Sequence, residues 1–297
     1  MSKLRRSLHF VPGGNEKMIA KALTLPADGL ILDLEDAVTV DRKAAARKVV
    51  LNWLETLDFG GRERWIRMNP LDTGFGEADL LETIAGKPDG YVVPKPRTAA
   101  DILAVARIID RLEEKHGIAF GFTRLLPIAT ETPEAVLNIA EIARATPRIA
   151  AISWGMEDLS SAMGIPRTRR RDGTLLDLFR HTRVMTLLAA AAAGVEALDT
   201  VYVDIPDLEG LRRESEEAAW MGFSGKISIH PTQIPVINQA FIPSAEEVAE
   251  ARELISAFEA HQKAGSGAFA FKGQMRDVPH LTRARKILER ARLAGVA

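Results

Sequence analysis

Cysteine is absent from this chain of 297 residues. Without a thiol, the chain can form no disulfide, use no thiolate nucleophile and hold no cysteine-ligated zinc. Carboxylates, histidines or carbonyl groups must therefore hold any bound metal. Such ligands suit a hard cation such as Mg²⁺.

The chain also lacks an excess of either charge, because 39 Lys and Arg face 40 Asp and Glu, for a formal net charge of −1. No global field favours nucleic acid or an anionic membrane as a partner. No uninterrupted apolar run reaches the roughly 18 residues of a membrane-spanning helix. The start, MSKLRRSLHF, lacks the apolar core and cleavage site of a secretory signal. We therefore expect a cytoplasmic protein that binds neither nucleic acid nor membrane.

Short apolar segments alternate along the chain with segments of helical periodicity, such as Val40–Leu57, Ala99–Lys115 and Thr186–Ala193. The expected strands are 7–11, 29–34, 65–68, 90–94, 125–129, 149–154, 197–203 and 226–229. Alternation of this kind predicts parallel pairing, and closure into a (β/α)₈ TIM barrel is the economical arrangement. Periodicity cannot show closure, so a doubly wound open sheet is the alternative α/β fold.

Two segments interrupt this rhythm. The basic segment Gly164–Leu176 follows the sixth strand and is most often a solvated loop in such a place. Near the other end, the small-residue linker Ala264–Ala268 leads to a helical pattern over Pro279–Ala294. We therefore expect a barrel catalytic domain over residues 1–263 and a C-terminal helical extension over 264–297.

Carboxylates and bases follow the expected strands where each strand ends, which is where a barrel carries its active site. Mg²⁺ takes one or two carboxylates and keeps water or substrate oxygens, and Glu131 and Asp158 follow strands five and six. Arg67 ends the third strand and could hold a carboxylate or a developing oxyanion. Other roles stay open, because Glu131 precedes Thr-Pro and could start a helix, Asp158 could cap one, and Lys95 could lie in a surface turn between two prolines.

Eight short motifs occur in a fixed order along nearly the whole chain. They are RSLHFVPG at 6–13, GLILDLEDAV at 29–38, IRMN at 66–69, VVPK at 92–95, ET at 131–132, GMEDL at 155–159, SIHP at 228–231 and GQMRD at 273–277. In these motifs the chain resembles the HpcH/HpaI aldolase and citrate lyase β-subunit superfamily, in its CitE-like branch. That branch includes lyases of citryl, malyl and citramalyl thioesters.

The resemblance implies a (β/α)₈ barrel that assembles as a homotrimer or hexamer, with Mg²⁺ held by Glu131 and Asp158. Arg67 matches the arginine at the substrate carbonyl. Asp277 matches a C-terminal aspartate that reaches the active site of a neighbouring subunit, so the extension would pack on that neighbour.

Supporting roles follow from the same resemblance. Lys21 matches a residue that binds coenzyme A phosphates, although Asn15 stands where some relatives have an arginine. Lys95 is expected to contribute to binding of the substrate or coenzyme A. Glu35 and Asp36 are expected to support the site by contacting the residues that bind metal and substrate, and Asp36 could instead cap a helix.

The implied activity is Mg²⁺-dependent cleavage of a 3-hydroxy-3-carboxy acyl thioester, of malyl-CoA or citramalyl-CoA type, to a 2-oxo acid and an acyl-CoA. One alternative is the citryl-acyl-carrier-protein lyase subunit, which is the citrate lyase β chain, and another is a barrel without catalysis. A metal-dependent aldolase of free hydroxy-oxo acids would rely on an early histidine, for which we do not expect His9 to serve. A Schiff-base aldolase would use Lys95 and need no metal.

Overall fold

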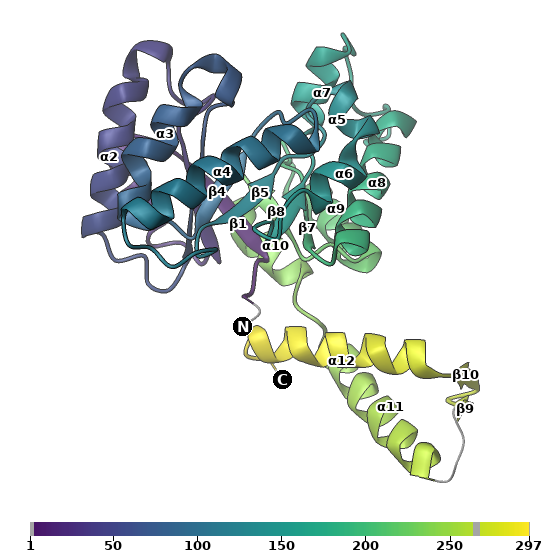
Figure 1. The fold of residues 1–297 in the computed structure, drawn as a ribbon. Helices are drawn as coiled ribbons and strands as arrows, with labels where there is room; N and C mark the ends of the chain where they lie inside the picture. The colour runs from purple at the N-terminus through teal and green to yellow at the C-terminus, as the bar shows by residue number, and fades with distance from the viewer. Residues whose placement is uncertain (1–2, 264–267, 297) are drawn as a thin grey trace. The chain divides into compact units, whose positions relative to one another are not determined.

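The computed structural model describes residues 3–263 and 268–296. They form two compact units, of which the first is Arg5–Asn238 and the second holds the described residues before Arg5 and after Asn238 (Figure 1). Within the described residues, no helix combines the length and the apolar character that crossing a membrane requires.

Eight parallel strands form the centre of the first unit. They are β1 (Ser7–Pro12), β2 (Gly29–Asp33), β3 (Glu63–Arg67), β4 (Gly90–Val93), β5 (Arg124–Pro127), β6 (Ala151–Ser153), β7 (Glu196–Asp199) and β8 (Gly225–Ser228). Their order is β5-β4-β3-β2-β1-β8-β7-β6, and parallel bridges Leu125–Ile149 and Ile128–Ser153 join the two ends. The ring therefore closes, which confirms the predicted barrel and excludes the open sheet.

Each expected strand overlaps one of these eight, and the expected bounds exceed the observed ones most at two places. The segment expected as 197–203 leaves the sheet after Asp199, and the segment expected as 149–154 pairs as a strand only over Ala151–Ser153. Apolar residues such as Val201 and Trp154 continue beyond these strand ends, so hydrophobicity alone does not show where pairing stops.

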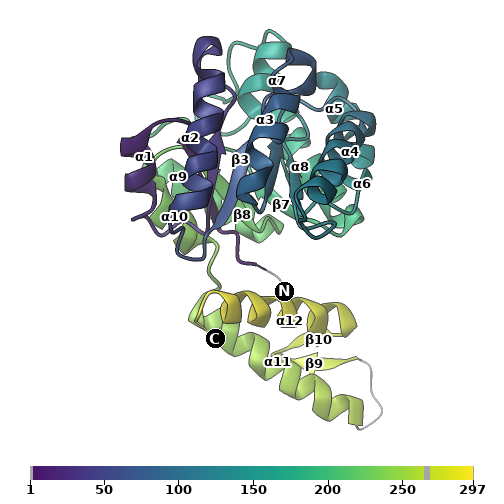
Figure 2. The same cartoon turned by 60° about the vertical axis from the view of Figure 1, so that its left-hand side comes forward.

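Helices cover the outside of the ring (Figures 1 and 2). They are α1 (Glu16–Ala22), α2 (Lys43–Thr56), α3 (Gly76–Thr83), α4 (Ala99–Lys115), α5 (Pro133–Leu137), α6 (Ile139–Arg144), α7 (Met156–Ala162), α8 (Asp177–Ala193), α9 (Leu208–Met221) and α10 (Gln233–Ala240). Single 3₁₀ turns lie at Val40–Arg42, Leu71–Thr73 and Ile84–Gly86. The expected helix Ala99–Lys115 is confirmed with both bounds, because a capping box of Thr98 and Asp101 marks its start.

One layer of apolar side chains fills the interior of the barrel. Every strand contributes to it, through Leu8, Ile31, Trp65, Val92, Leu126, Ala151, Leu198 and Ile227, with Ile128 just beyond β5. Burial of each valine, leucine or isoleucine side chain in this layer contributes about 1.5–3 kcal/mol. This filled interior leaves the carboxyl ends of the strands as the place where polar groups can meet.

The second unit is a helical hairpin with a small sheet. It contains α11 (Ala245–Lys263), the antiparallel pair β9 (Phe269–Phe271) and β10 (Gln274–Arg276), and α12 (Val278–Leu293). Its core consists of Ala251, Leu254, Phe258, Phe269, Leu281 and Ala284.

The boundary between the two units falls at Asn238, earlier than the boundary expected after residue 263, because α11 packs with α12. The expected last helix, Pro279–Ala294, corresponds to α12 with each end shifted by one residue. Residues 264–267 of the expected linker lie outside the described residues. Packing of this unit on a neighbouring subunit stays a prediction.

Candidate active site

Seven charged residues gather where β2, β3, β4, β5 and β6 end. We call them the rim cluster: Asp33, Glu35, Asp36, Arg67, Lys95, Glu131 and Asp158. Hydrogen bonds and ion pairs link them into one network. Six of the seven are residues that the sequence singled out, so the structure brings the predicted carboxylates and cations together.

Glu131 is the more deeply buried of the two predicted metal ligands. It is 3% exposed, and its Oε2 accepts a hydrogen bond of 2.5 Å from the backbone N–H of Lys95. Burial raises the pKa of Glu131 well above its usual range, and the charges of Asp158 and Glu35 act in the same direction. Thr132 is the N-cap residue of α5, and Pro133 is the first residue of that helix. Glu131 therefore does not cap it.

Gly155 makes room for the Glu131 side chain. A Cβ atom at position 155 would lie 2.4 Å from Glu131 Cγ, which is far inside van der Waals contact. The backbone N–H of Gly155 donates to Thr130 Oγ1 at 3.1 Å, which ties the end of β6 to the end of β5. Gly155 also occupies the N-cap position of α7, and Asp158 lies in the first turn of that helix. Asp158 is therefore not the N-cap residue, and its side chain is 34% exposed.

Lys95 contacts both predicted metal ligands. Its ammonium group lies 2.6 Å from Glu35 Oε1, 3.3 Å from Asp158 Oδ1 and 3.5 Å from Asp36 Oδ1. Its φ of 49° is left-handed, which is unfavourable for a residue other than glycine. Burial acts to lower the pKa of Lys95, but the hydrogen bond and charge of Glu35 outweigh burial and raise it. A Schiff-base lysine must be neutral to react, so this pKa argues against that alternative, and the contacts argue against a simple surface turn.

Arg67 is held mainly by Asp33. Its Nε and Nη2 donate to the two carboxylate oxygens of Asp33 at 2.7 and 2.6 Å. Its Nη1 lies 3.0 Å from Glu35 Oε2 and 3.6 Å from Asp36 Oδ2. The Phe10 ring lies under the guanidinium, 4.6 Å from its centroid. Asp33 therefore occupies Nε and one N–H of Nη2, and a substrate oxygen would meet the remaining N–H groups, where Glu35 already lies close to Nη1.

Asp33 and Gly155 are the residues that the sequence reasoning missed. Asp33 stands directly opposite Arg67 in the β2–β3 register, and it also accepts hydrogen bonds from the backbone N–H groups of Glu35 and Ala37. The register could have identified Asp33, because two strand-end residues of opposite charge lie side by side. Gly155 had no signal of this kind in the sequence.

The rim cluster carries an excess of negative charge. Five carboxylates (Asp33, Glu35, Asp36, Glu131 and Asp158) face two cations (Arg67 and Lys95), which gives a formal charge of −3 with every group ionised. Among the described residues, no group of three or more His, Asp or Glu side chains is arranged to hold a metal. Two carboxylates with an uncompensated negative charge fit Mg²⁺, which completes its shell with water or substrate oxygens.

Four residues that the sequence analysis discussed are not part of the rim cluster. Lys21 is exposed in the last turn of α1, and no hydrogen bond or ion pair within residues 3–263 and 268–296 links it to the rim cluster. Asp277 belongs to the second unit, where it forms a capping box with His280 at the start of α12. His9 is buried in β1 beside Ser228 Oγ at 2.9 Å, and burial lowers its pKa to about 4. Asn15 caps α1 through a bond from the Met18 N–H.

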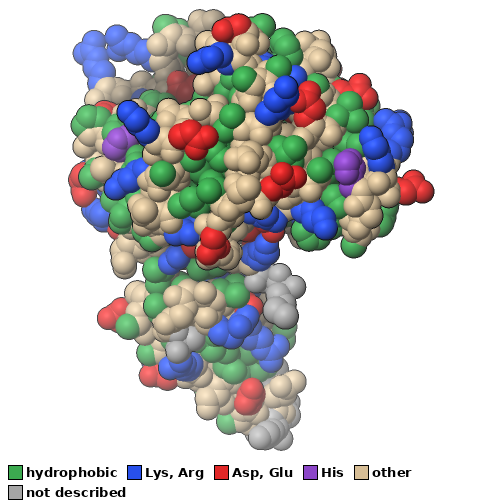
Figure 3. All heavy atoms as spheres, turned by 90° about the vertical axis from the view of Figure 1, so that its left-hand side faces the viewer, with side chains coloured by type: hydrophobic (Ala, Val, Ile, Leu, Met, Phe, Trp, Pro, Cys, Tyr) green, Lys and Arg blue, Asp and Glu red, His purple; other side chains and the backbone are tan. Residues whose placement is uncertain are grey.

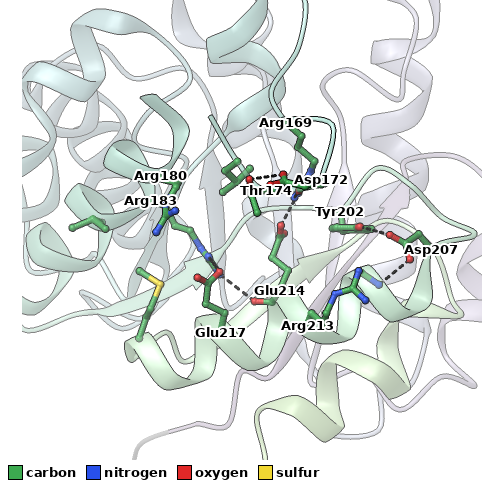
Figure 4. A pocket seen from close by; sticks show the side chains of 15 residues that line it. Arg169, Asp172, Thr174, Arg180, Arg183, Tyr202, Asp207, Arg213, Glu214 and Glu217 are labelled. Carbon is green, nitrogen blue, oxygen red and sulfur yellow. Dashed lines mark hydrogen bonds and ion pairs between the residues drawn. The ribbon is translucent and has the colours of Figure 1, made fainter. Parts of the chain in front are cut away.

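A second group of charges lies beside a cavity of about 340 Å³ between α8, α9 and the segment 169–175, and Arg169, Arg183, Glu214 and Glu217 line that cavity (Figure 4). We call this group the α8–α9 cluster: Asp199, Glu214, Glu217, Arg169, Arg183 and Lys226. Lys226 Nζ lies 3.0 Å from Asp199 and 2.9 Å from Glu214, Arg183 bonds Asp199 and Glu217, and Arg169 bonds Glu214 at 2.6 Å. Three cations thus match three anions. In this basic segment, Arg169 is an ion-paired anchor rather than part of a solvated loop.

On the face of the first unit that Figure 3 shows, acidic and basic side chains are interspersed. That face has no large field of one sign. The excess of negative charge in the rim cluster is therefore a local property and does not reflect the surface as a whole.

Comparison with known proteins identifies the family. Residues 6–231 match the model of the HpcH/HpaI aldolase/citrate lyase family. The chain is 37% identical to the citrate lyase subunit beta of Escherichia coli K12, over 99% of this chain and 96% of that protein. It is 38% identical to the (3S)-malyl-CoA thioesterase of Cereibacter sphaeroides, over 96% of this chain and 94% of that protein.

A solved structure shows the same relationship. The CitE protein of Mycobacterium tuberculosis, solved with magnesium, acetoacetate and coenzyme A, superposes with a TM-score of 0.79 at 37% identity, over 97% of this chain and 98% of that one. The chain therefore belongs to the HpcH/HpaI aldolase/citrate lyase family. The predicted resemblance is confirmed, and so is the prediction of a carbon–carbon lyase at the level of the family.

Proposed function

We propose that this chain is a Mg²⁺-dependent carbon–carbon lyase that cleaves a malyl-CoA or citramalyl-CoA type thioester to a 2-oxo acid and an acyl-CoA. The observation that supports it most is the rim cluster, in which two carboxylates, one after β5 and one in the helix after β6, lie in a group with excess negative charge. The M. tuberculosis CitE structure contains magnesium and coenzyme A, and these are the cofactor and the substrate class proposed here.

Glu131 and Asp158 would hold the metal. Carboxylate oxygens are the ligands that Mg²⁺ prefers, and buried Glu131 has only the Lys95 N–H as a hydrogen-bond donor among the described residues. When bound, Mg²⁺ would polarise the hydroxyl and carboxylate oxygens of the substrate and lower the pKa of that hydroxyl. Glu35 and Asp36 would support the site by holding Lys95 and Arg67 in place.

The proposed cleavage is a reverse Claisen reaction. A base takes the proton of the substrate hydroxyl, the hydroxyl oxygen forms the new carbonyl of the 2-oxo acid, and the electron pair of the C–C bond moves to the thioester as an enolate. Arg67 would stabilise the enolate oxygen through an N–H that does not donate to Asp33, since Asp33 holds the guanidinium through Nε and Nη2. Asp277 of a neighbouring copy would carry a proton to the enolate carbon, which completes the acyl-CoA.

The coenzyme A moiety and the assembly are further parts of this proposal. Lys21 is exposed and can meet a phosphate, and Lys95 can contribute a second positive charge near the thioester. A homotrimer or hexamer would bring the second unit of one copy, with Asp277, to the rim cluster of another.

A thioester carried by an acyl carrier protein is the alternative that the E. coli relative favours, because that protein is a citrate lyase subunit beta. The C. sphaeroides relative is named a thioesterase, which would release free coenzyme A rather than a 2-oxo acid. These three activities differ in their products and in their need for a carrier protein.

An assay of the purified chain with Mg²⁺ and malyl-CoA, citramalyl-CoA or citryl-CoA separates them when 2-oxo acid and free thiol are measured in parallel. The proposal predicts 2-oxo acid and acyl-CoA without a carrier protein. It also predicts a loss of activity of about a thousandfold in Glu131→Gln and in Asp158→Asn. Free thiol without 2-oxo acid would instead identify a thioesterase. With citryl-carrier-protein as a fourth substrate in the same assay, turnover of that thioester alone would identify a citrate lyase subunit.

A further inference from the structure

Lys95 stands in an unusual relation to the two residues proposed to bind the metal. Its backbone N–H donates to Glu131, while its ammonium group lies 3.3 Å from Asp158. One residue therefore contacts both carboxylates, one through the main chain and the other through the side chain. A lysine whose side chain extended into solvent from the same loop would not contact both carboxylates.

The backbone at this position is held against its own preference. The φ of 49° is left-handed, and Lys95 precedes Pro96, which adds a further steric restriction. Such a conformation costs on the order of a few RT and persists only when surrounding contacts determine it. The contacts at hand are the Lys95 bonds to Glu131, Glu35 and Asp158. The strain therefore accompanies an arrangement in which a positive charge is directed into the rim cluster.

The ammonium group of Lys95 partly neutralises the rim cluster, and Mg²⁺ bound at the same carboxylates would compete with it. Without Lys95 the formal charge of the rim cluster would be −4 instead of −3, since only Arg67 would remain against five carboxylates. Mg²⁺ bound to Asp158 would meet the ammonium group already paired with that carboxylate. Two cations on one carboxylate repel each other strongly at such distances.

We propose that Lys95 is a positioning residue that acts as a counter-ion: its ammonium group pairs with Asp158 until Mg²⁺ displaces it. Because Mg²⁺ must displace the ammonium group, Lys95 weakens the affinity of the site for the metal. Glu35 is not one of the proposed metal ligands, and its hydrogen bond of 2.6 Å with the ammonium group can persist after Mg²⁺ has displaced that group from Asp158. Lys95 thus holds the carboxylates together in the metal-free protein and keeps the metal exchangeable. This inference rests on the proposed Mg²⁺ site but not on any lyase activity.

The inference predicts an unusual sign, because loss of a residue within the site should strengthen metal binding. Lys95→Met keeps most of the length of the side chain and the backbone N–H to Glu131 but removes the charge. We expect Mg²⁺ alone, titrated calorimetrically against the full-length chain without substrate, to bind Lys95→Met at least about tenfold more tightly than the wild type. A residue that merely supports the ligands would weaken binding when it is lost.

Two further variants make the result decisive. Arg97→Met removes an exposed cation two residues away that pairs with Asp72 rather than with the rim cluster, and it should leave the Mg²⁺ affinity unchanged. Lys95→Gln serves as the second neutral variant if Lys95→Met does not fold, and it should also bind more tightly. Unchanged or weaker Mg²⁺ binding in the neutral variant overturns the inference while wild-type binding leaves the metal site standing. A wild type that binds no Mg²⁺ overturns the metal site and this inference together.

Discussion

The two charge clusters of the barrel unit, the rim cluster and the α8–α9 cluster, differ in how their charges balance. The α8–α9 cluster pairs three cations with three anions, and its Lys226 and Asp199 are each 0% exposed. The rim cluster sets five carboxylates against two cations, and Asp36 is 58% exposed. A group balanced in charge around a fully buried pair is what a structural tie requires, whereas a group with uncompensated negative charge can bind a cation from solution.

The difference also appears in the directions of the pKa shifts. Burial alone would raise the pKa of Asp199, but the charges of Lys226 and Arg183 lower it to about 2. Burial raises the pKa of Glu131, and the neighbouring carboxylates raise it further. The same fold thus stabilises the ionised form of one buried carboxylate and destabilises the ionised form of the other.

The largest expected effect on stability comes from breaking the balanced group. Lys226→Met leaves Asp199 and Glu214 without their shared cation, so we expect the free energy of unfolding to fall by about 3–5 kcal/mol. Urea denaturation followed by circular dichroism measures this change. Arg212→Met is the control, because Arg212 is exposed and its loss should cost less than about 1 kcal/mol. Equal losses in both variants would remove the contrast between the two groups.

Gly155→Ala tests how closely the rim cluster is packed. The new Cβ would lie 2.4 Å from Glu131 Cγ, so the Glu131 side chain must shift. We expect a loss of about 1–3 kcal/mol in stability, together with weaker Mg²⁺ binding. Ser161→Ala, at an exposed position of the same helix α7, should change neither quantity. Normal Mg²⁺ affinity in Gly155→Ala would show that the position of Glu131 does not matter for the metal.

The smallest expected effect is a difference in how stability depends on pH in the absence of metal. Because the pKa of Glu131 is raised in the folded chain, the folded state binds more protons than the unfolded state above the ordinary pKa of a glutamate. Stability therefore falls as pH rises through that range. In EDTA, Glu131→Gln should be more stable than the wild type at pH 8, and thermal melts should show the gap narrow toward pH 5. A gap that widens toward pH 5 would contradict the assigned direction.

The sequence predicted the rim cluster well because parallel strands in a barrel all end at one rim, so strand-end residues such as Glu131 and Arg67 had to meet. It did not predict Asp33 as the partner of Arg67, since that pairing depends on register. It gave no indication of the α8–α9 cluster, because Asp199 and Lys226 lie within expected strands and read there as isolated charges in apolar segments. The roles of Lys21 and Asp277 stay predictions, because they depend on coenzyme A and on a second copy of the chain.

The most direct test of the central claim is a comparison of thermal unfolding with and without Mg²⁺ in the wild type and in the double variant Glu131→Gln/Asp158→Asn. A ligand that binds the folded state stabilises it, by about 2.7 kcal/mol at a concentration a hundred times its Kd. We predict that saturating Mg²⁺ raises the Tm of the wild type and leaves the Tm of the double variant unchanged. The same Mg²⁺-dependent rise in both proteins would show that the rim cluster does not hold the metal.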